Sequence, residues 1–375
     1  MNPSIRYSFA TASMLLVAAC SSPDRGPLAP SGSSASLRET AASTWLVTFR
    51  DDVTDVRGVA AEMARRGRFA LMDVREHAAR GFTAELSPAA VEQLRNDPRV
   101  LILELDAIIQ LDEPDAQIGQ PFSGQRASYG LARVGGSGDG TGKTAWILDT
   151  GIDLTHPDLN TSRDCHVSFV FRQPDPSDYN GHGTHVAGTV AAVNNDIFTL
   201  GVAANAYVCS VRVLDASGSG AWSWIVAGIN YVAANGAMGE VANMSLGGRG
   251  ANATVEKAVL DASKRVKFTL AAGNYGIHAD GFTPARVNGN NVYTVSAIGA
   301  DDCLASWSNY GNPPVDFAAP GVRILSLFKN GSTAVYSGTS MAAPHVAGIL
   351  LLGRVRSDGV ACRDPDGNPD PIAHR

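Results

Sequence analysis

The sequence predicts an α/β protein with a mostly parallel central sheet, preceded by a smaller α+β unit. Two observations lead to this prediction. From about residue 144 onward, apolar segments that end in small or polar residues alternate with helical segments, which is typical of a parallel sheet covered on both faces. Before residue 110, a shorter pattern of strands and helices is complete in itself. The 375 residues, of which 45% are hydrophobic, suffice for one large core and a second, smaller one.

The first twenty residues have the composition of a targeting segment. Arg6 is followed by a short apolar stretch and by small residues that lead to Cys20 in VAAC. This ending resembles the lipobox of bacterial lipoproteins, whose cysteine is lipidated after cleavage. An ordinary secretory signal cut near the same place is the alternative. Both predict export to the cell surface or the medium, with residues 1–20 as the signal and the polar residues 21–43 as a linker.

Export would allow the remaining cysteines to form disulfides, because compartments outside the cytoplasm are oxidising. Without Cys20 the chain has Cys165, Cys209, Cys303 and Cys362, and four cysteines allow three disulfide connectivities. We favour the pairs Cys165–Cys209 and Cys303–Cys362. No Cys-x-x-Cys pair is present, which disfavours a zinc knuckle.

Residues 44–110 follow the pattern of a small separate domain. Strands are expected over 44–49, 69–77, 81–86 and 99–109, with helices over 56–67 and from Pro88 to about residue 97. Ser87 is placed to cap the second helix. The order β-α-β-β-α-β predicts a ferredoxin-like unit. The polar residues 111–127, with Pro and Gly, are expected to form an exposed connector.

In the larger unit, three polar residues follow apolar strands, where ligands of parallel sheets bind. These are Asp149, Ser245 and Asn274. Asp149 stands in Asp-Thr-Gly, which also occurs in aspartic proteases, but those need a second such acid and this chain has no second Asp-Thr-Gly or Asp-Ser-Gly.

Two histidines lie close together in NGHGTHVAGTV. His182 stands between glycines, which let other groups approach its ring, and His185 follows one helical turn later. A metal site at this pair is disfavoured, because the glutamate of the His-Glu-x-x-His pattern is missing.

Three segments together, ILDTGID, NGHGTHVAGTV and SGTSMAAPHVAG, resemble the catalytic segments of the subtilisin-like serine proteases, and YGLARV resembles the start of their proteinase K branch. The resemblance covers nearly all of residues 128–353. It implies a subtilisin-like three-layer sandwich over 128–375 and a serine endopeptidase without a catalytic cofactor. The chain order Asp, His, Ser is the order known for subtilisin.

The resemblance also implies roles for single residues. Ser340 is the expected nucleophile, His182 the proton carrier and Asp149 its orienting partner. In TLAAGNYG, Asn274 is the expected side-chain donor of the oxyanion hole. The residues expected to bind substrate are Ser245, Leu246, Gly247, Ala271 and Gly273, and their small size suggests room for apolar or aromatic side chains.

A structural calcium ion is also implied by the family. Asp316 matches one of its ligands, and the carbonyl groups of Asn290 and Val292 are the expected partners. A second acidic stretch, DPDGNPD over 364–370, lacks the spacing of an EF-hand loop, and we expect it to be a solvated turn.

The same resemblance gives the 44–110 unit a role as an inhibitory propeptide, removed by self-cleavage between Ile108 and Gln125. The expected partners are therefore protein substrates and the chain's own propeptide. A lipid at Cys20 is the further expected attachment, and the enzyme is expected to be a monomer. The net charge of −6 disfavours a nucleic-acid partner. The sequence contains no run of 18 apolar residues, so a membrane-spanning helix is not expected.

Two alternative functions, a binding protein without activity and an esterase, are disfavoured by the sequence. A lapsed protease that only binds is disfavoured because all three triad residues and Asn274 are present. An esterase is disfavoured because it requires a Gly-x-Ser-x-Gly turn and an acid and histidine that follow the serine.

Overall fold

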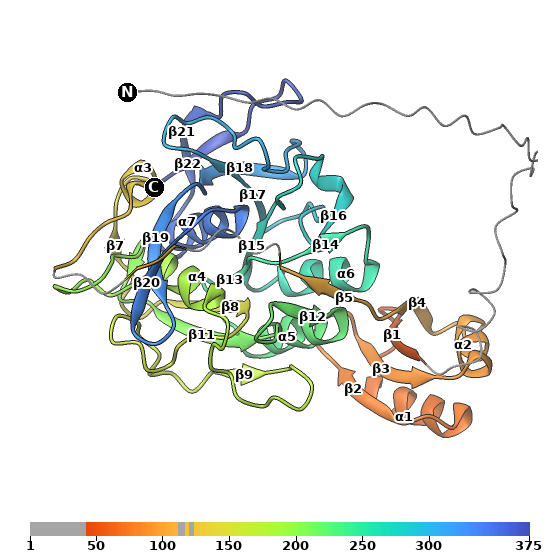
Figure 1. Cartoon of the computed structure of the whole chain (residues 1–375). Coiled ribbons are helices and arrows are strands. Elements are labelled where there is room, and N and C mark those ends of the chain that lie inside the picture. The colour runs from red at the N-terminus through yellow and green to blue at the C-terminus, as the bar shows by residue number, and fades with distance from the viewer. Residues whose placement is uncertain (1–42, 112–116, 120–123) are drawn as a thin grey trace, which may run out of the picture. The chain divides into compact units, whose positions relative to one another are not determined.

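A nine-stranded sheet forms the centre of the larger part of the chain (Figure 1). The structure is a computed structural model and describes residues 43–111, 117–119 and 124–375. From one edge to the other, the strands of this sheet are β21 (Arg356–Val360), β22 (Pro371–His374), β18 (Val315–Pro320), β17 (Val292–Ile298), β15 (Lys267–Ala271), β13 (Val241–Met244), β8 (Thr144–Asp149), β11 (Tyr207–Arg212) and β9 (Val167–Ser168). All neighbouring pairs are parallel except β21 with β22, so the predicted mostly parallel sheet is confirmed.

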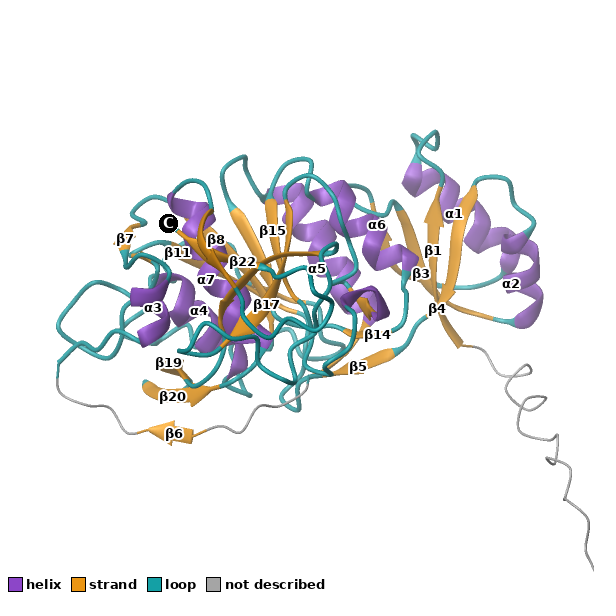
Figure 2. Cartoon of the chain, turned by 90° about the horizontal axis from the view of Figure 1, so that it is seen from above, coloured by secondary structure: helices purple, strands orange, loops and turns teal. Residues whose placement is uncertain are grey.

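Helices cover both faces of this sheet (Figure 2). Along β8 the buried side chains alternate: Ala145 and Ile147 join one core cluster, and Trp146 and Leu148 join another. The first cluster contains α4 (His182–Ala191) and α7 (Thr339–Leu352), and the second contains α5 (Trp222–Asn235) and α6 (Ala253–Ala262). This alternation follows from the two-residue period of a strand, and it makes three layers, as predicted.

Short elements complete the larger part. They are α3 (Tyr129–Arg133), β7 (Gly138–Asp139), β10 (Ala203–Ala204), β12 (Ser219–Ala221), β14 (Gly248–Arg249), η1 (Ala279–Gly281), β16 (Phe282–Thr283), β19 (Ile324–Phe328) and β20 (Ser332–Tyr336). Among the helices of the described residues, none is long and apolar enough to cross a membrane.

The smaller part has a sheet and a core of its own. It consists of β1 (Ser43–Phe49), α1 (Val56–Gly67), β2 (Leu71–Arg75), β3 (Gly81–Leu86), α2 (Pro88–Arg95) and β4 (Val100–Leu105). The strands pair antiparallel in the order β2-β3-β1-β4. Ser87 caps α2 by accepting the backbone N–H of Ala90 at 3.2 Å, as its place before Pro88 predicts. The order of elements is the one expected from the sequence.

The strand expected over 99–109 is divided in two: β4 ends at Leu105, and β5 (Ile108–Gln110) pairs with β12 instead of joining the small sheet. The connector 111–127 is more structured than expected, because residues 117–119 form β6 (Gln117–Gly119), which pairs with β20. The side chain of Gln125 donates to the carbonyl groups of Val193 and Thr199 at 2.6 and 2.7 Å. The predicted signal with Cys20, and the linker up to residue 42, lie outside the described residues.

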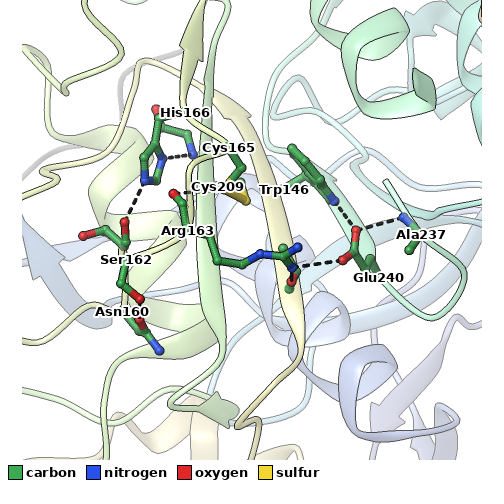
Figure 3. Close-up of a disulfide and its surroundings, with 12 residues drawn as sticks. Trp146, Asn160, Ser162, Arg163, Cys165, His166, Cys209, Ala237 and Glu240 are labelled. Atoms are coloured by element: carbon green, nitrogen blue, oxygen red, sulfur yellow. Dashed lines mark hydrogen bonds and ion pairs between the residues drawn. A yellow bond between two sulfur atoms is a disulfide. The ribbon is translucent and has the colours of Figure 1, made fainter. Parts of the chain in front are cut away.

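Both favoured disulfide pairs are present, Cys165–Cys209 and Cys303–Cys362. The first joins the loop before β9 to β11 (Figure 3). Beside it, His166 accepts the backbone N–H of Ser210 at 3.0 Å and donates to the carbonyl of Thr161 at 2.8 Å. The loop is therefore fastened to the sheet by a covalent bond and by hydrogen bonds.

We expect that replacing Cys165 and Cys209 by serine lowers the stability of the fold by about 2–4 kcal/mol, because a cross-link over 44 residues restricts the unfolded chain. The midpoint of thermal unfolding of the double variant, compared with that of the unchanged chain, tests this. An unchanged midpoint would contradict a stabilising role.

Candidate active site

Asp149 and His182 meet at the carboxyl edge of the sheet. Asp149 is the last residue of β8 and His182 the first of α4. The Nδ1 atom of His182 lies 2.8 Å from Oδ1 of Asp149. Both side chains are buried, and Oδ2 of Asp149 has no hydrogen-bond partner among the described residues. A carboxylate at this distance from Nδ1 fixes the orientation of the imidazole ring.

Two glycines allow this approach. A side chain at Gly183 would place its Cβ 2.0 Å from the carbonyl oxygen of Gly151, so only glycine lets α4 lie against the end of β8. Gly181 has a φ of +119°, and a Cβ there would overlap the ring of Phe328. The glycines on either side of His182 thus serve the close approach that the sequence suggested.

Asp178 fixes the start of α4. The cap residue Gly181 offers no side chain, and Asp178 takes its place. Its Oδ1 accepts the backbone N–H of Gly181 at 2.8 Å and the hydroxyl of Thr150 at 2.9 Å. Its Oδ2 accepts the backbone N–H and the hydroxyl of Thr184 at 2.9 and 2.6 Å. This residue was not predicted from the sequence, although its place four residues before His182 resembles an acidic helix cap.

Ser340 lies in the first turn of α7, where Gly338 holds the cap position. Its side chain therefore does not cap the helix and is only 7% exposed. Pro344 lies in the second turn of α7, and it has no N–H to donate to the carbonyl of Ser340. The hydroxyl of Ser245 donates to that carbonyl instead, at 2.8 Å, and the Ser340 hydroxyl donates to the carbonyl of Ser245 at 3.2 Å.

The amide of Asn274 is oriented by the residue before Ser340. Its Oδ1 accepts the backbone N–H and the hydroxyl of Thr339, both at 2.9 Å. The hydroxyl of Thr339 also accepts the backbone N–H of Gly273 at 3.0 Å. With its oxygen held in this way, Asn274 has its NH₂ group available beside the turn at Gly338, 3.6 Å from where a Cβ of that glycine would lie.

All five residues expected to bind substrate line one pocket together with Asn274 and Ser340; they are Ser245, Leu246, Gly247, Ala271 and Gly273. Phe282, which sequence analysis missed, also lines this pocket, and a Cβ at Gly247 would lie 2.3 Å from its ring. Gln110 and Leu111 of the chain itself line the same pocket.

The other histidine of the motif is part of the core. His185 is fully buried, stacks on Tyr336 with 4.6 Å between ring centroids, and donates from Nε2 to the carbonyl of Ile324 at 3.0 Å. Burial lowers the pKa of His185 to about 3, so its ring is neutral. Within the described ranges, no group of three or more His, Cys, Asp or Glu side chains is arranged to hold a metal ion.

The residues expected at a calcium site lie at β17 and β18. Asp316 is on β18, its Oδ2 accepts the backbone N–H of Thr294 at 2.8 Å, and burial raises the pKa of its carboxyl group to about 6. Val292 begins β17, and Asn290 lies in the turn before it.

The acidic stretch 364–370 was expected to be a solvated turn, and this is wrong for Asp370. Asp370 is fully buried and its Oδ2 accepts the hydroxyl of Ser296 at 2.6 Å. Burial, with the nearby carboxylates of Asp364 and Asp366, raises the pKa of Asp370 to about 7. The cause is the pairing of β22 with β18, which draws the residue before β22 into the protein.

Residues 140–358 match the model of the Subtilase family. Alkaline serine exoprotease A of Vibrio alginolyticus is 40% identical over 289 residues, which cover 74% of this chain and 52% of that protein, so the chain spans about half its length. An alkaline protease of Alkalihalobacillus alcalophilus is 41% identical over 277 residues, covering 72% of this chain and 68% of that protein.

A crystal structure of a cold-adapted subtilisin-like serine proteinase is 38% identical to this chain. It covers 63% of this chain and 89% of its own, with a TM-score of 0.56.

We expect Asp178→Ala to loosen the start of α4 and so to misplace His182. The buried donors that it leaves without a partner should lower stability by about 1–3 kcal/mol. The rate at which a fluorophosphonate labels Ser340 should fall as well. Asp175→Ala is the control, because Asp175 is exposed and its carboxylate accepts the backbone N–H of Ser177 and the hydroxyl of the exposed Tyr179, neither of which lies in α4. Wild-type labelling and stability in the Asp178 variant would contradict its positioning role.

Proposed function

This chain belongs to the subtilase family of serine endopeptidases, and we propose that it cleaves proteins through an Asp149-His182-Ser340 triad after processing its own precursor. The observation that carries the proposal is the buried hydrogen bond between Asp149 and His182 at the start of α4, a helix that shares a core cluster with α7, whose first turn contains Ser340. Asp149 holds the imidazole in one tautomer, which leaves Nε2 to take the proton of the Ser340 hydroxyl.

Attack of Ser340 Oγ on the scissile carbonyl forms a tetrahedral intermediate with a negative oxygen. His182, now protonated, donates its proton to the leaving amine as the acyl-enzyme forms, and water then releases the acyl group by the same steps in reverse. The amide of Asn274 and the backbone N–H of Ser340 are the donors for the negative oxygen. Both are placed before the reaction begins, because Thr339 holds Asn274 and the helix holds Ser340.

Residues 43–111 act as the inhibitor of the same chain in this proposal. β5 pairs antiparallel with β12, and the backbone N–H of Leu111 donates to the carbonyl of Gly218 at 3.0 Å. Ile109 is buried against Trp222, and Gln110 and Leu111 reach the pocket that contains Ser340. The chain therefore lies along the cleft as a substrate would, by strand addition.

Two carboxylates hold the inhibitor on helix starts. Glu104 accepts the backbone N–H groups of Ala253 and Thr254, at 2.9 and 3.0 Å, at the beginning of α6. Asp106 accepts the backbone N–H of Ser223 at 3.0 Å, in the first turn of α5. Negative charge is favourable at both places, since the first N–H groups of a helix lack partners within it.

We further propose that the precursor is exported, with Cys20 as the site of a lipid. Cleavage beyond Leu111 would then separate the enzyme from the anchored segment, so the enzyme would be released while its inhibitor stays at the surface. The substrates proposed are proteins and peptides, with the enzyme acting as a monomer.

A calcium ion at Asp316, with the carbonyl groups of Asn290 and Val292, is also proposed. The residue types fit the ion: Asp316 offers a carboxylate that burial leaves poorly solvated, and β17, which Val292 begins, is the neighbouring strand, so carboxylate and carbonyl oxygens are hard donors that water can complete. The ion would supply charge compensation there and no catalytic step.

The self-processing prediction compares the purified precursor with its Ser340→Ala variant. The wild type should shorten, with a new amino terminus within a few residues after Leu111, and the variant should remain intact. Mass spectrometry reads the new terminus. Ser337→Ala, which removes a neighbouring hydroxyl that accepts only the backbone N–H of Arg323, should process normally. Equal shortening of wild type and Ser340→Ala would point to another protease.

For calcium, we expect that adding the ion to the Ser340→Ala precursor raises its midpoint of thermal unfolding and that a chelator reverses this. A concentration one hundred times the dissociation constant corresponds to about 2.7 kcal/mol. Asp316→Asn should abolish the effect, whereas Asp366→Asn, in the exposed part of the 364–370 stretch, should keep it. An undiminished calcium effect in Asp316→Asn would refute this site.

A further inference from the structure

Strand β20 lies between two neighbours of different origin. On one side it forms a hairpin with β19, and on the other it pairs antiparallel with β6 of the connector. The register places Gln117 opposite Val335, Ile118 opposite Ala334 and Gly119 opposite Thr333. β20 ends at Tyr336, four residues before Ser340, so β6 pairs with a strand that leads directly to the proposed nucleophile.

The direction of the pairing matches the path of a substrate. Leu111 is held at Gly218 and lines the pocket that contains Ser340, and Gln117 is held at Val335, five residues before Ser340 in the chain. Only five residues separate them, which limits the distance between the two anchors to about 20 Å. Because β6 is antiparallel to β20, the chain moves away from Ser340 as it passes from Gln117 to Gly119.

The contact depends on the backbone rather than on side chains. Ile118 is 64% exposed, so its side chain adds little burial. Backbone hydrogen bonds along a strand edge are available to any extended polypeptide. One position is selective: a Cβ at Gly119 would lie 3.2 Å from Oγ1 of Thr333, a buried atom without a hydrogen-bond partner in the part of the chain that is described.

We infer that the edge of β20, Thr333–Val335, is a docking strand for the carboxyl-side part of extended polypeptide substrates, and that Gln117–Gly119 fill it in the precursor. The inference rests on the proposed function, because it extends the same cleft. A three-residue strand pairs weakly on its own. Cutting the chain after Leu111 removes the link to the amino-side anchor, so β6 dissociates and leaves the edge to substrates. The site favours long, unfolded chains with a small residue opposite Thr333.

The test uses the processed enzyme and quenched fluorescent peptides that share one sequence on the amino side. One set ends two residues after the scissile bond and the other nine residues after it. We expect kcat/KM to be about 5- to 30-fold higher for the long set, mainly through a lower KM, as one or two net hydrogen bonds imply.

A second series places an N-methyl group on one residue at a time in the long peptide. In a strand, successive N–H groups point to opposite sides, so methylation should lower kcat/KM at every second position of the distal part and leave the intervening positions unchanged. Peptides with bulky residues along the distal part should lose the advantage at one position, the one opposite Thr333.

Equal rates for short and long peptides, with both cleaved, would overturn the docking strand and leave the proposed function standing. A length effect without alternation along the methylated series would also overturn it, because side chains rather than the backbone would then be recognised. Failure to cleave either set would overturn the proposed function and this inference together.

Discussion

A chain of buried hydrogen bonds connects the centre of the sheet to the proposed nucleophile, and the site depends on it. The hydroxyl of Thr269 donates to the amide oxygen of Asn243, whose NH₂ group donates to the hydroxyl of Ser245, and this hydroxyl donates to the carbonyl of Ser340. All four residues are buried, so each group would be costly to leave without a partner. Pro344 has no backbone N–H to donate to the Ser340 carbonyl, and the hydroxyl of Ser245 donates to this carbonyl instead. The proline within α7 thus fastens the helix to the strand that lines the substrate pocket.

Because α7 is fastened to the sheet in this way, the polar groups at the carboxyl edge of the sheet have little freedom to move relative to Ser340. β15, β13 and β8 are neighbours, and their carboxyl ends carry or precede Asn274, Ser245 and Asp149. A parallel sheet brings these ends to one edge, and α7 packs across the same strands. His182 is the group that the sheet does not place directly. It depends on Asp178 and on the close approach at Gly183, which is why a side chain remote from the reacting atoms has so many hydrogen bonds.

The sequence predicted the parts of this arrangement that are carried by local patterns. Strands that end in polar residues, helices with recognisable caps, and glycines beside His182 are read directly from neighbouring residues. Asp178, Thr339 and Phe282 were not predicted, since each acts through a partner that only folding brings near. The burial of Asp370 depends on β22 adding to β18, and the strand at Gln117–Gly119 depends on an edge more than 200 residues away. The polar composition of these two segments indicated a solvated turn and an exposed connector. Composition shows how well a segment interacts with water, but it does not show which strands the folded chain brings next to it.

The segments before and after residues 112–116 contact the larger part of the chain to different extents, and this difference would give the proposed processing a direction. On the amino side Ile109 is 6% exposed, β5 is paired, and Glu104 and Asp106 lie at two helix starts, so this segment has contacts that do not depend on the scissile bond. On the carboxyl side the described contact is a three-residue pairing with an exposed isoleucine. While the chain is intact, the first anchor keeps the second at a high effective concentration. After the cut that link is lost, and the weaker segment leaves first. In the proposed processing, the enzyme would then still be inhibited on its amino side, so cleavage and activation would be separate events, and activity would appear only when the tighter segment dissociates or is itself degraded.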